Sequence, residues 1–136
     1  MPKPDLLVDT HILLWWKAGS KRLPKSVLDA IRTPEGPQVS PITFWEVATL
    51  VRKGRLALDR APTRWSIDVL ADPDEPLRVA PLSPAVAAAA GAFETVHGDP
   101  ADRLILATAQ THGLTLATSD STLADAAASM GISVLG

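Results

Sequence analysis

Cysteine is absent from the 136-residue chain, and so is tyrosine. The first absence excludes a disulfide framework, a thiolate zinc site and a cysteine nucleophile, and it fits a reducing, intracellular compartment. No apolar run approaches the roughly 20 residues that cross a bilayer, and Asp9 and His11 interrupt the apolar segment near the N-terminus. We therefore expect a cytoplasmic protein that has no membrane span and no targeting segment.

Basic residues are scarce in the second half of the chain. Eleven of the 13 Lys and Arg side chains lie between Lys3 and Arg64, whereas nine of the 15 acids follow residue 64. A fold that brings the two halves together could set a basic rim beside an acidic pocket, or most of these charges could simply lie on solvated helix faces. Glycine-rich turns of the G-x-G-x-x-G or G-K-[ST] type are missing as well, which disfavours nucleotide-binding folds.

Short apolar runs alternate with helical patterns along the chain. The strand candidates are residues 5–8, 38–40, 77–81, 114–118 and 132–135. The helix candidates are residues 11–17, 24–33, 43–53, 62–71, 84–96, 100–112 and 121–130. Continuous apolar strands separated by helices predict an α/β fold, a three-layer sandwich with a central, mainly parallel sheet and helices on both faces. Because no linker interrupts the pattern, we expect residues 1–136 to form one domain.

Acidic residues follow the strand candidates at junctions between loops and helices. Asp9 closes the first strand, Asp120 follows residues 114–118, and Asp99 and Asp102 open a helix. In α/β sheets the functional groups gather beyond the carboxyl ends of the strands, so several of these acids could share one crevice. Each of them is also in a position to cap a helix, and Asp102 could pair with Asp99 in a capping-box-like arrangement.

Glu46 is harder to explain as a cap, because it lies inside the helix candidate 43–53 and shares a face with Ile42 and Leu50. We expect its carboxylate to be partly buried, and no Lys or Arg stands three or four residues away to pair with it. Converging carboxylates repel each other unless a cation is present, and an all-oxygen site suits Mg²⁺ or Mn²⁺ rather than zinc. Such an ion activates water and polarises a phosphoryl oxygen, which predicts phosphodiester hydrolysis.

Four segments, in sequence order, resemble the PIN domain of VapC-type toxins. They are LLVDTHILLWW (6–16), VSPITFWEVA (39–48), GDPADRLILATA (98–109) and LATSDSTL (116–123). The chain departs from that family at Ser119, where a basic residue often stands before the last acid. The resemblance implies a metal-dependent ribonuclease that uses Mg²⁺, with Mn²⁺ able to substitute. It also implies an RNA substrate, a homodimer and neutralisation by a small antitoxin protein.

The resemblance assigns the catalytic, metal-binding roles to a set of four acids and adds Asp99 as a fifth, outer acid. The four are Asp9, Glu46, Asp102 and Asp120. Thr10 and Ser40 are candidates for orienting these carboxylates, although both could simply cap helices. Arg103 could contact phosphate or pair with a neighbouring acid, and Trp16 could pack in the core or meet a partner.

Two other functions stay open. A catalytically inactive PIN-fold binding module would use the acids only as caps and would present its apolar surface to a partner protein. A dehalogenase-like, Mg²⁺-dependent phosphatase also places an Asp after the first strand, but the second Asp of its Asp-x-Asp motif would fall at His11. A clustered acidic site should melt at a higher temperature with Mn²⁺, whereas mutually independent caps should not.

Overall fold

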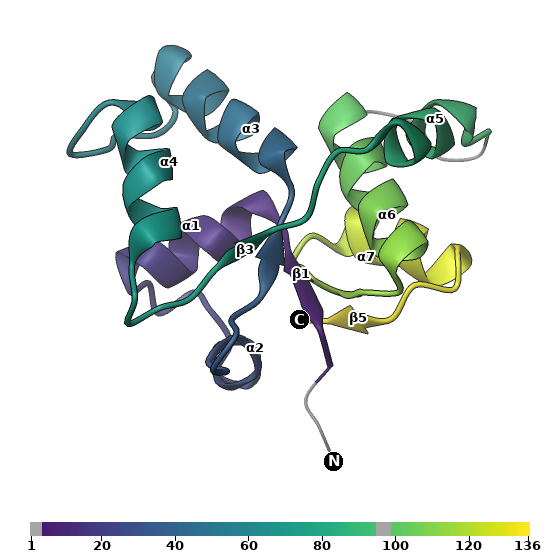
Figure 1. Ribbon diagram of the computed structural model, residues 1–136, viewed down its shortest axis with the longest axis horizontal. Coiled ribbons are helices and arrows are strands. Elements are labelled where there is room, and N and C mark those ends of the chain that lie inside the picture. Colours follow the sequence, from purple (N-terminus) through teal and green to yellow (C-terminus); the bar gives the residue numbers. More distant parts are fainter. Residues whose placement is uncertain (1–3, 95–98) are drawn as a thin grey trace.

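The computed structural model describes residues 4–94 and 99–136. Within these ranges a five-stranded sheet forms the centre, with every neighbouring pair parallel, in the order β3-β2-β1-β4-β5. The strands are β1 (Leu6–Val8), β2 (Gln38–Val39), β3 (Arg78–Val79), β4 (Thr115–Ala117) and β5 (Val134–Leu135). The α/β class and the parallel sheet predicted from the sequence are confirmed (Figure 1).

Helices cover both faces of the sheet, as predicted. In the described ranges they are α1 (Thr10–Ala18), α2 (Lys25–Ile31), α3 (Pro41–Arg52), α4 (Pro62–Ala71), α5 (Pro84–Ala92), α6 (Pro100–His112) and α7 (Ser121–Ser129). Helices α1 to α4 pack on one face, in a core that contains Leu6 and Val8 of β1. Leu7 points to the other face and packs with residues of α6 and α7, and α5 packs against α6. Figure 1 shows the two groups of helices on opposite sides of the strands.

The order of the strands creates a switch point between β1 and β4. From β1 the chain passes to β2 and β3 on one side of the sheet, and it then returns to β4 and β5 on the other. Val8 pairs with Ala117, and the Asp9 amide donates to the Ala117 carbonyl at 3.1 Å, so the two strands end together. Asp9 and the nearby Asp120 therefore enter the crevice where α/β proteins place their ligands.

Most predicted boundaries agree with the structure to within two residues, and two differ for physical reasons. The helices at 62–71 and 100–112 have the predicted bounds, and Gly113 caps the second with a left-handed φ of 63°. The prediction of a helix to residue 96 is wrong, since α5 ends at Ala92, and residue 96 itself lies outside the described residues. The strand predicted at 77–81 is shorter because Pro81 has no N–H for the ladder.

Membrane insertion was not expected from the sequence. Across residues 4–94 and 99–136, no helix combines the length and the apolar character that crossing a bilayer requires. The longest of them, α6, has 13 residues.

Candidate active site

A small acidic cavity opens at the carboxyl ends of β1 and β4. Five carboxylates from separate parts of the chain line it, namely Asp9, Glu46, Asp99, Asp102 and Asp120. Thr10, His11, Ile105 and Leu123 complete the lining of this cavity, whose volume is about 150 Å³. The structure thus brings together every acid that the sequence analysis selected.

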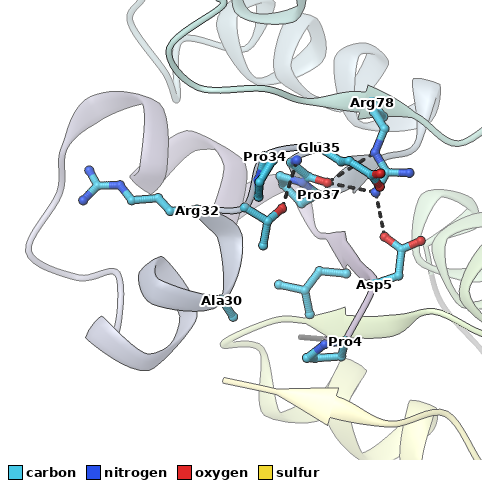
Figure 2. Close-up of a pocket in the computed structure, with 11 residues that line it drawn as sticks. Pro4, Asp5, Ala30, Arg32, Pro34, Glu35, Pro37 and Arg78 are labelled. Carbon is cyan, nitrogen blue, oxygen red and sulfur yellow. Dashed lines mark hydrogen bonds and ion pairs between the residues drawn. The ribbon is translucent and has the colours of Figure 1, made fainter. Parts of the chain in front are cut away.

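A larger pocket, of about 460 Å³, lies at the opposite end of the sheet, where β1 and β2 begin (Figure 2). Its central charges are paired, because Arg78 donates to Asp5 at 2.8 Å and to the Gly36 carbonyl at 2.9 Å. Pocket size therefore does not identify the functional site. The excess of like charge does, and it distinguishes the smaller, acidic cavity.

Three of the five acids also begin helices. Each of Asp9, Asp99 and Asp120 accepts a backbone N–H from its own helix through Oδ1, at 2.8 to 2.9 Å. Helices α1, α6 and α7 thus start at the cavity, with the positive ends of their dipoles beside the carboxylates. The capping role considered from the sequence is correct for these three residues, and the capping side chains are the same ones that line the cavity.

Glu46 reaches the cavity from α3 and is half-buried, as predicted. Thr10 Oγ1 donates to Glu46 Oε1 at 2.5 Å, and Thr43 Oγ1 lies 3.2 Å from Thr10 Oγ1. Because the single hydroxyl proton of Thr10 goes to the carboxylate, Thr43 must donate to Thr10. Burial raises the pKa of Glu46, the bond from Thr10 lowers it, and the charges of Asp99 and Asp102 raise it. A chain of two hydroxyls therefore orients this carboxylate.

Asp9 is enclosed, with 5% of its surface exposed. Thr118 Oγ1 donates to Asp9 Oδ2. The same threonine hydroxyl accepts a hydrogen bond from the Asp120 amide at 3.1 Å. Burial raises the pKa of Asp9, the hydrogen bonds from Thr118 and Ile12 lower it, and the charge of Asp120 raises it. The buried hydroxyl of Thr118 thus connects two acids of the cavity.

Asp102 faces the other acids from the first turn of α6. Burial raises the pKa of Asp102 to about 6, and the charges of Asp99, Asp120 and Asp9 contribute to the rise. The positive charge of His11 opposes this effect. Burial and the neighbouring negative charges both raise the pKa of Asp102, and therefore both disfavour its ionised form. The ionised Asp102 thus destabilises the metal-free fold near pH 7.

The donor set of the cavity fits a hard divalent cation. Five carboxylates dominate its lining, with His11 beside them, and the chain has no cysteine. Within residues 4–94 and 99–136, no three acidic or histidine side chains already stand in an arrangement that would hold an ion. Like charges repel, so a cation has to draw the carboxylates together as it binds. Asp9, Glu46, Asp102 and Asp120 are placed to do this, with Asp99 at the exposed edge.

Comparison with known protein families identifies the family of the chain. Residues 6–129 match the PIN domain. The chain belongs to the PIN-domain family. Ribonuclease VapC22 from Mycobacterium tuberculosis is 38% identical to this PIN domain over 116 residues, which cover 85% of this chain and 86% of that protein. The resemblance to VapC-type PIN domains inferred from four short segments is confirmed, and the dehalogenase-like alternative is set aside.

Two toxin–antitoxin structures share the fold of this PIN domain. A chain of a toxin–antitoxin complex from Klebsiella pneumoniae is 25% identical, with a TM-score of 0.60, covering 86% of this chain and 88% of that one. A chain of VapBC2 from Rickettsia felis, bound to a promoter DNA fragment, is 16% identical, with a TM-score of 0.66 and 96% of both chains covered. At this identity, the second similarity supports the fold alone.

Ser40 and Trp16 have structural roles in this PIN domain. Ser40 is fully buried, and its hydroxyl accepts from the Ile42 amide at 3.2 Å, so it caps α3 and does not line the acidic cavity. Of the two residues predicted to orient carboxylates, Thr10 alone contacts one of the five. Trp16 is 5% exposed and packs in the core on the α1 face, which decides between its two interpretations.

Thr118 and Thr43 hold the site together, and the sequence analysis did not select them. Thr118 bonds to Asp9, and Thr43 reaches Glu46 through Thr10. The one signal for Thr118 is its position, two residues before Asp120 at the end of a strand candidate. A threonine at such a place is common in sheets, so position alone does not reveal which carboxylate it meets.

In metal-free buffer at pH 7.5, Asp102→Asn should raise the melting temperature. The pKa of Asp102 is raised on folding, so the folded protein holds the Asp102 proton more tightly than the unfolded chain does. The contribution of Asp102 to the free energy of unfolding is therefore fully present at low pH and is lost as the pH rises from 3.8 to about 6. Discounted for partial exposure, the gain is about 1 kcal/mol, or about 3 °C for a chain of this size. With Mn²⁺ the order should reverse, because the wild type binds the ion more tightly.

Differential scanning fluorimetry with EDTA and with Mn²⁺ measures both effects. Asp125→Asn, which changes an exposed acid of α7 outside the cavity, is the control and should be neutral in both buffers. Equal melting temperatures for wild type and Asp102→Asn in both buffers would show that the acids of the cavity do not repel one another enough to affect stability.

Thr10→Val should make Mn²⁺ binding more sensitive to acid. The substitution removes the hydrogen bond that lowers the pKa of Glu46, so that pKa rises further and protons compete with the ion at higher pH. Calorimetric titration should show several-fold weaker binding at pH 6 and a smaller loss at pH 8. Thr10→Ser keeps the hydroxyl and should behave as wild type. An equal loss at both pH values would indicate a change of geometry instead.

Proposed function

We propose that this PIN domain is a divalent-metal-dependent endoribonuclease and the toxin of a toxin–antitoxin pair. The observation that carries the proposal is the convergence of Asp9, Glu46, Asp102 and Asp120 on one cavity at the switch point of the sheet. Similarity to Ribonuclease VapC22 over most of both chains supports RNA as the substrate. Mg²⁺ is the proposed cofactor, and Mn²⁺ replaces it.

Asp9, Glu46, Asp102 and Asp120 would hold the ion, which when bound would supply an activated water and polarise the scissile phosphate. The chain contributes ligands of fixed orientation, because Thr118 and the start of α1 hold Asp9, and Thr10 holds Glu46. Asp102 must be ionised to act as a ligand, and because its pKa is about 6, protons compete with the ion and weaken binding as the pH falls below that value. The N-termini of α1, α6 and α7 face the same cavity and favour the phosphate charge.

A basic groove adjoins the acidic cavity, and His11 lines both. It has a volume of about 740 Å³ and apolar walls that include Leu14, Trp15 and Trp65. Its cations are Lys17, Arg22, Arg55 and Arg60. Lys17 is paired with Glu75, and Arg60 with Asp59 and Asp68, so Arg22 and Arg55 supply most of the positive charge of the groove. The groove fits the basic rim that the uneven distribution of charge suggested. We assign the groove to the antitoxin, as the binding site of an apolar segment that carries acidic side chains. The similarity to a chain of the toxin–antitoxin complex from Klebsiella pneumoniae supports such a partner.

Homodimerisation is the remaining part of the proposal, and it rests on the family resemblance. Two apolar side chains are largely exposed on neighbouring helices, Trp45 of α3 at 57% and Ile67 of α4 at 61%. An interface between two copies that includes these helices would remove both side chains from water.

The nuclease proposal predicts metal-dependent cleavage of RNA. Purified protein freed of antitoxin should cut total RNA with Mg²⁺ or Mn²⁺ and should not cut it with EDTA. Asp102→Asn should lower the cleavage rate by about 100-fold or more, because it removes a negative ligand from the reacting centre. Asp125→Asn is the matched control and should cut as wild type does.

Folded wild-type protein that leaves every RNA intact with metal present would contradict the proposal. Absence of Mn²⁺ stabilisation in the same sample would then favour the inactive binding module.

The groove assignment predicts a charge-dependent interaction with the antitoxin. Arg55→Glu should weaken antitoxin binding by about tenfold, with a smaller effect at high salt, because it reverses one charge in a basic groove. Arg52→Glu, an exposed charge reversal on α3 outside the groove, is the control. Biolayer interferometry against the antitoxin that co-purifies with the native protein measures the affinity. Unchanged antitoxin affinity together with slower RNA cleavage would assign the groove to the substrate.

A further inference from the structure

Arg103 follows Asp102 in the first turn of α6, but its guanidinium reaches back to α5. Arg103 Nε donates to the Ala90 carbonyl at 3.0 Å, and a terminal nitrogen donates to the Phe93 carbonyl at 2.6 Å. The same nitrogen is 3.5 Å from the Gly91 carbonyl. The guanidinium carbon also lies 5.7 Å from the centroid of the Phe93 ring. One side chain of α6 thus contacts the whole last turn of α5.

Helix α5 ends in a way that makes this contact important. The residue after Ala92 is Phe93, which has extended backbone (φ −62°, ψ 123°) rather than the left-handed conformation of a glycine cap. The last carbonyls of a helix have no partner within the helix, and the helix dipole favours a positive charge beside them. Arg103 supplies both the donors and the charge, and so replaces the missing C-cap.

The end of α5 matters to the acidic cavity because the chain runs from it to Asp99. Asp99 lines the cavity and accepts from the Ala101 amide at 2.9 Å, and Asp102 follows in the same turn. Helices α5 and α6 pack directly on each other through small and branched side chains. A clamp between the last turn of α5 and the first turn of α6 therefore holds the turn that carries two of the five carboxylates.

We propose that Arg103 is a positioning residue, which sets the placement of Asp99 and Asp102 in the acidic cavity by capping α5 from the first turn of α6. Its effect on metal binding rests on the proposed function, whereas its effect on the Asp99 cap does not. The planar fork of the guanidinium is essential to this role, because it reaches two carbonyls at once and an ammonium group does not.

The test compares substitutions at two arginines, Arg103 and Arg78, whose guanidinium groups both donate to backbone carbonyls. Arg103→Met removes the fork and keeps an apolar stem. Arg78→Met is the matched control, because Arg78 donates to the Gly36 carbonyl and to Asp5 at the far end of the sheet (Figure 2). Both substitutions should lower the melting temperature. Arg103→Met alone should weaken Mn²⁺ binding, by about tenfold, the size expected when a group that orients a metal ligand is lost. Arg103→Lys should be intermediate.

A second, metal-free measurement separates this proposal from the proposed function. Amide hydrogen exchange at Ala101, whose N–H the Asp99 cap accepts, should be faster in Arg103→Met and unchanged in Arg78→Met. If this is seen while the wild type neither binds Mn²⁺ nor cuts RNA, the proposed function fails and the positioning role stands. Equal Mn²⁺ affinity and equal Ala101 exchange in the two variants would overturn the positioning role.

Discussion

Crowding of carboxylates at one edge of a parallel sheet is the constraint on which the rest of this PIN domain depends. β1 and β4 end together, so Asp9 and Asp120 are neighbours through topology and not through sequence. Burial and like charge raise the pKa values of Asp9, Glu46 and Asp102. Helix N-termini and threonine hydroxyls offset part of this repulsion. The part that is left costs stability in the protein without a bound cation.

Local signals in the sequence were sufficient for the architecture. Pro100 and Gly113 mark the two ends of α6, and continuous apolar runs indicated buried parallel strands. The end of α5 was missed because the residues that follow Ala92, Phe93 to Val96, include no glycine or proline to mark the end of a helix. What caps that helix is Arg103, which lies on another helix, and a pattern within one segment does not contain such a tertiary contact.

The acids of the candidate site were predictable for the same reason. Asp9 and Asp120 follow strands, Asp99 and Asp102 stand at the start of a helix, and Glu46 lies on an otherwise apolar helix face. Of the hydroxyls that orient them, Thr10 was a candidate from the sequence. Thr118 and Thr43 were not, because Thr118 is 109 residues from Asp9 and Thr43 acts through a second threonine. The uneven charge distribution indicated a basic rim, but the apolar walls of the groove became visible only with the fold.

The hydroxyl of Thr118 has a consequence for how the protein is made. It joins Asp9 to the Asp120 amide across 109 residues, and β4, which precedes it, pairs with β1. Chains leave the ribosome N-terminus first, so Asp9 and Glu46 are exposed to the cell long before the strand that completes their site is available. A nascent chain therefore holds only part of the acidic cluster. The acidic cavity is therefore complete only after nearly all of the domain has left the ribosome.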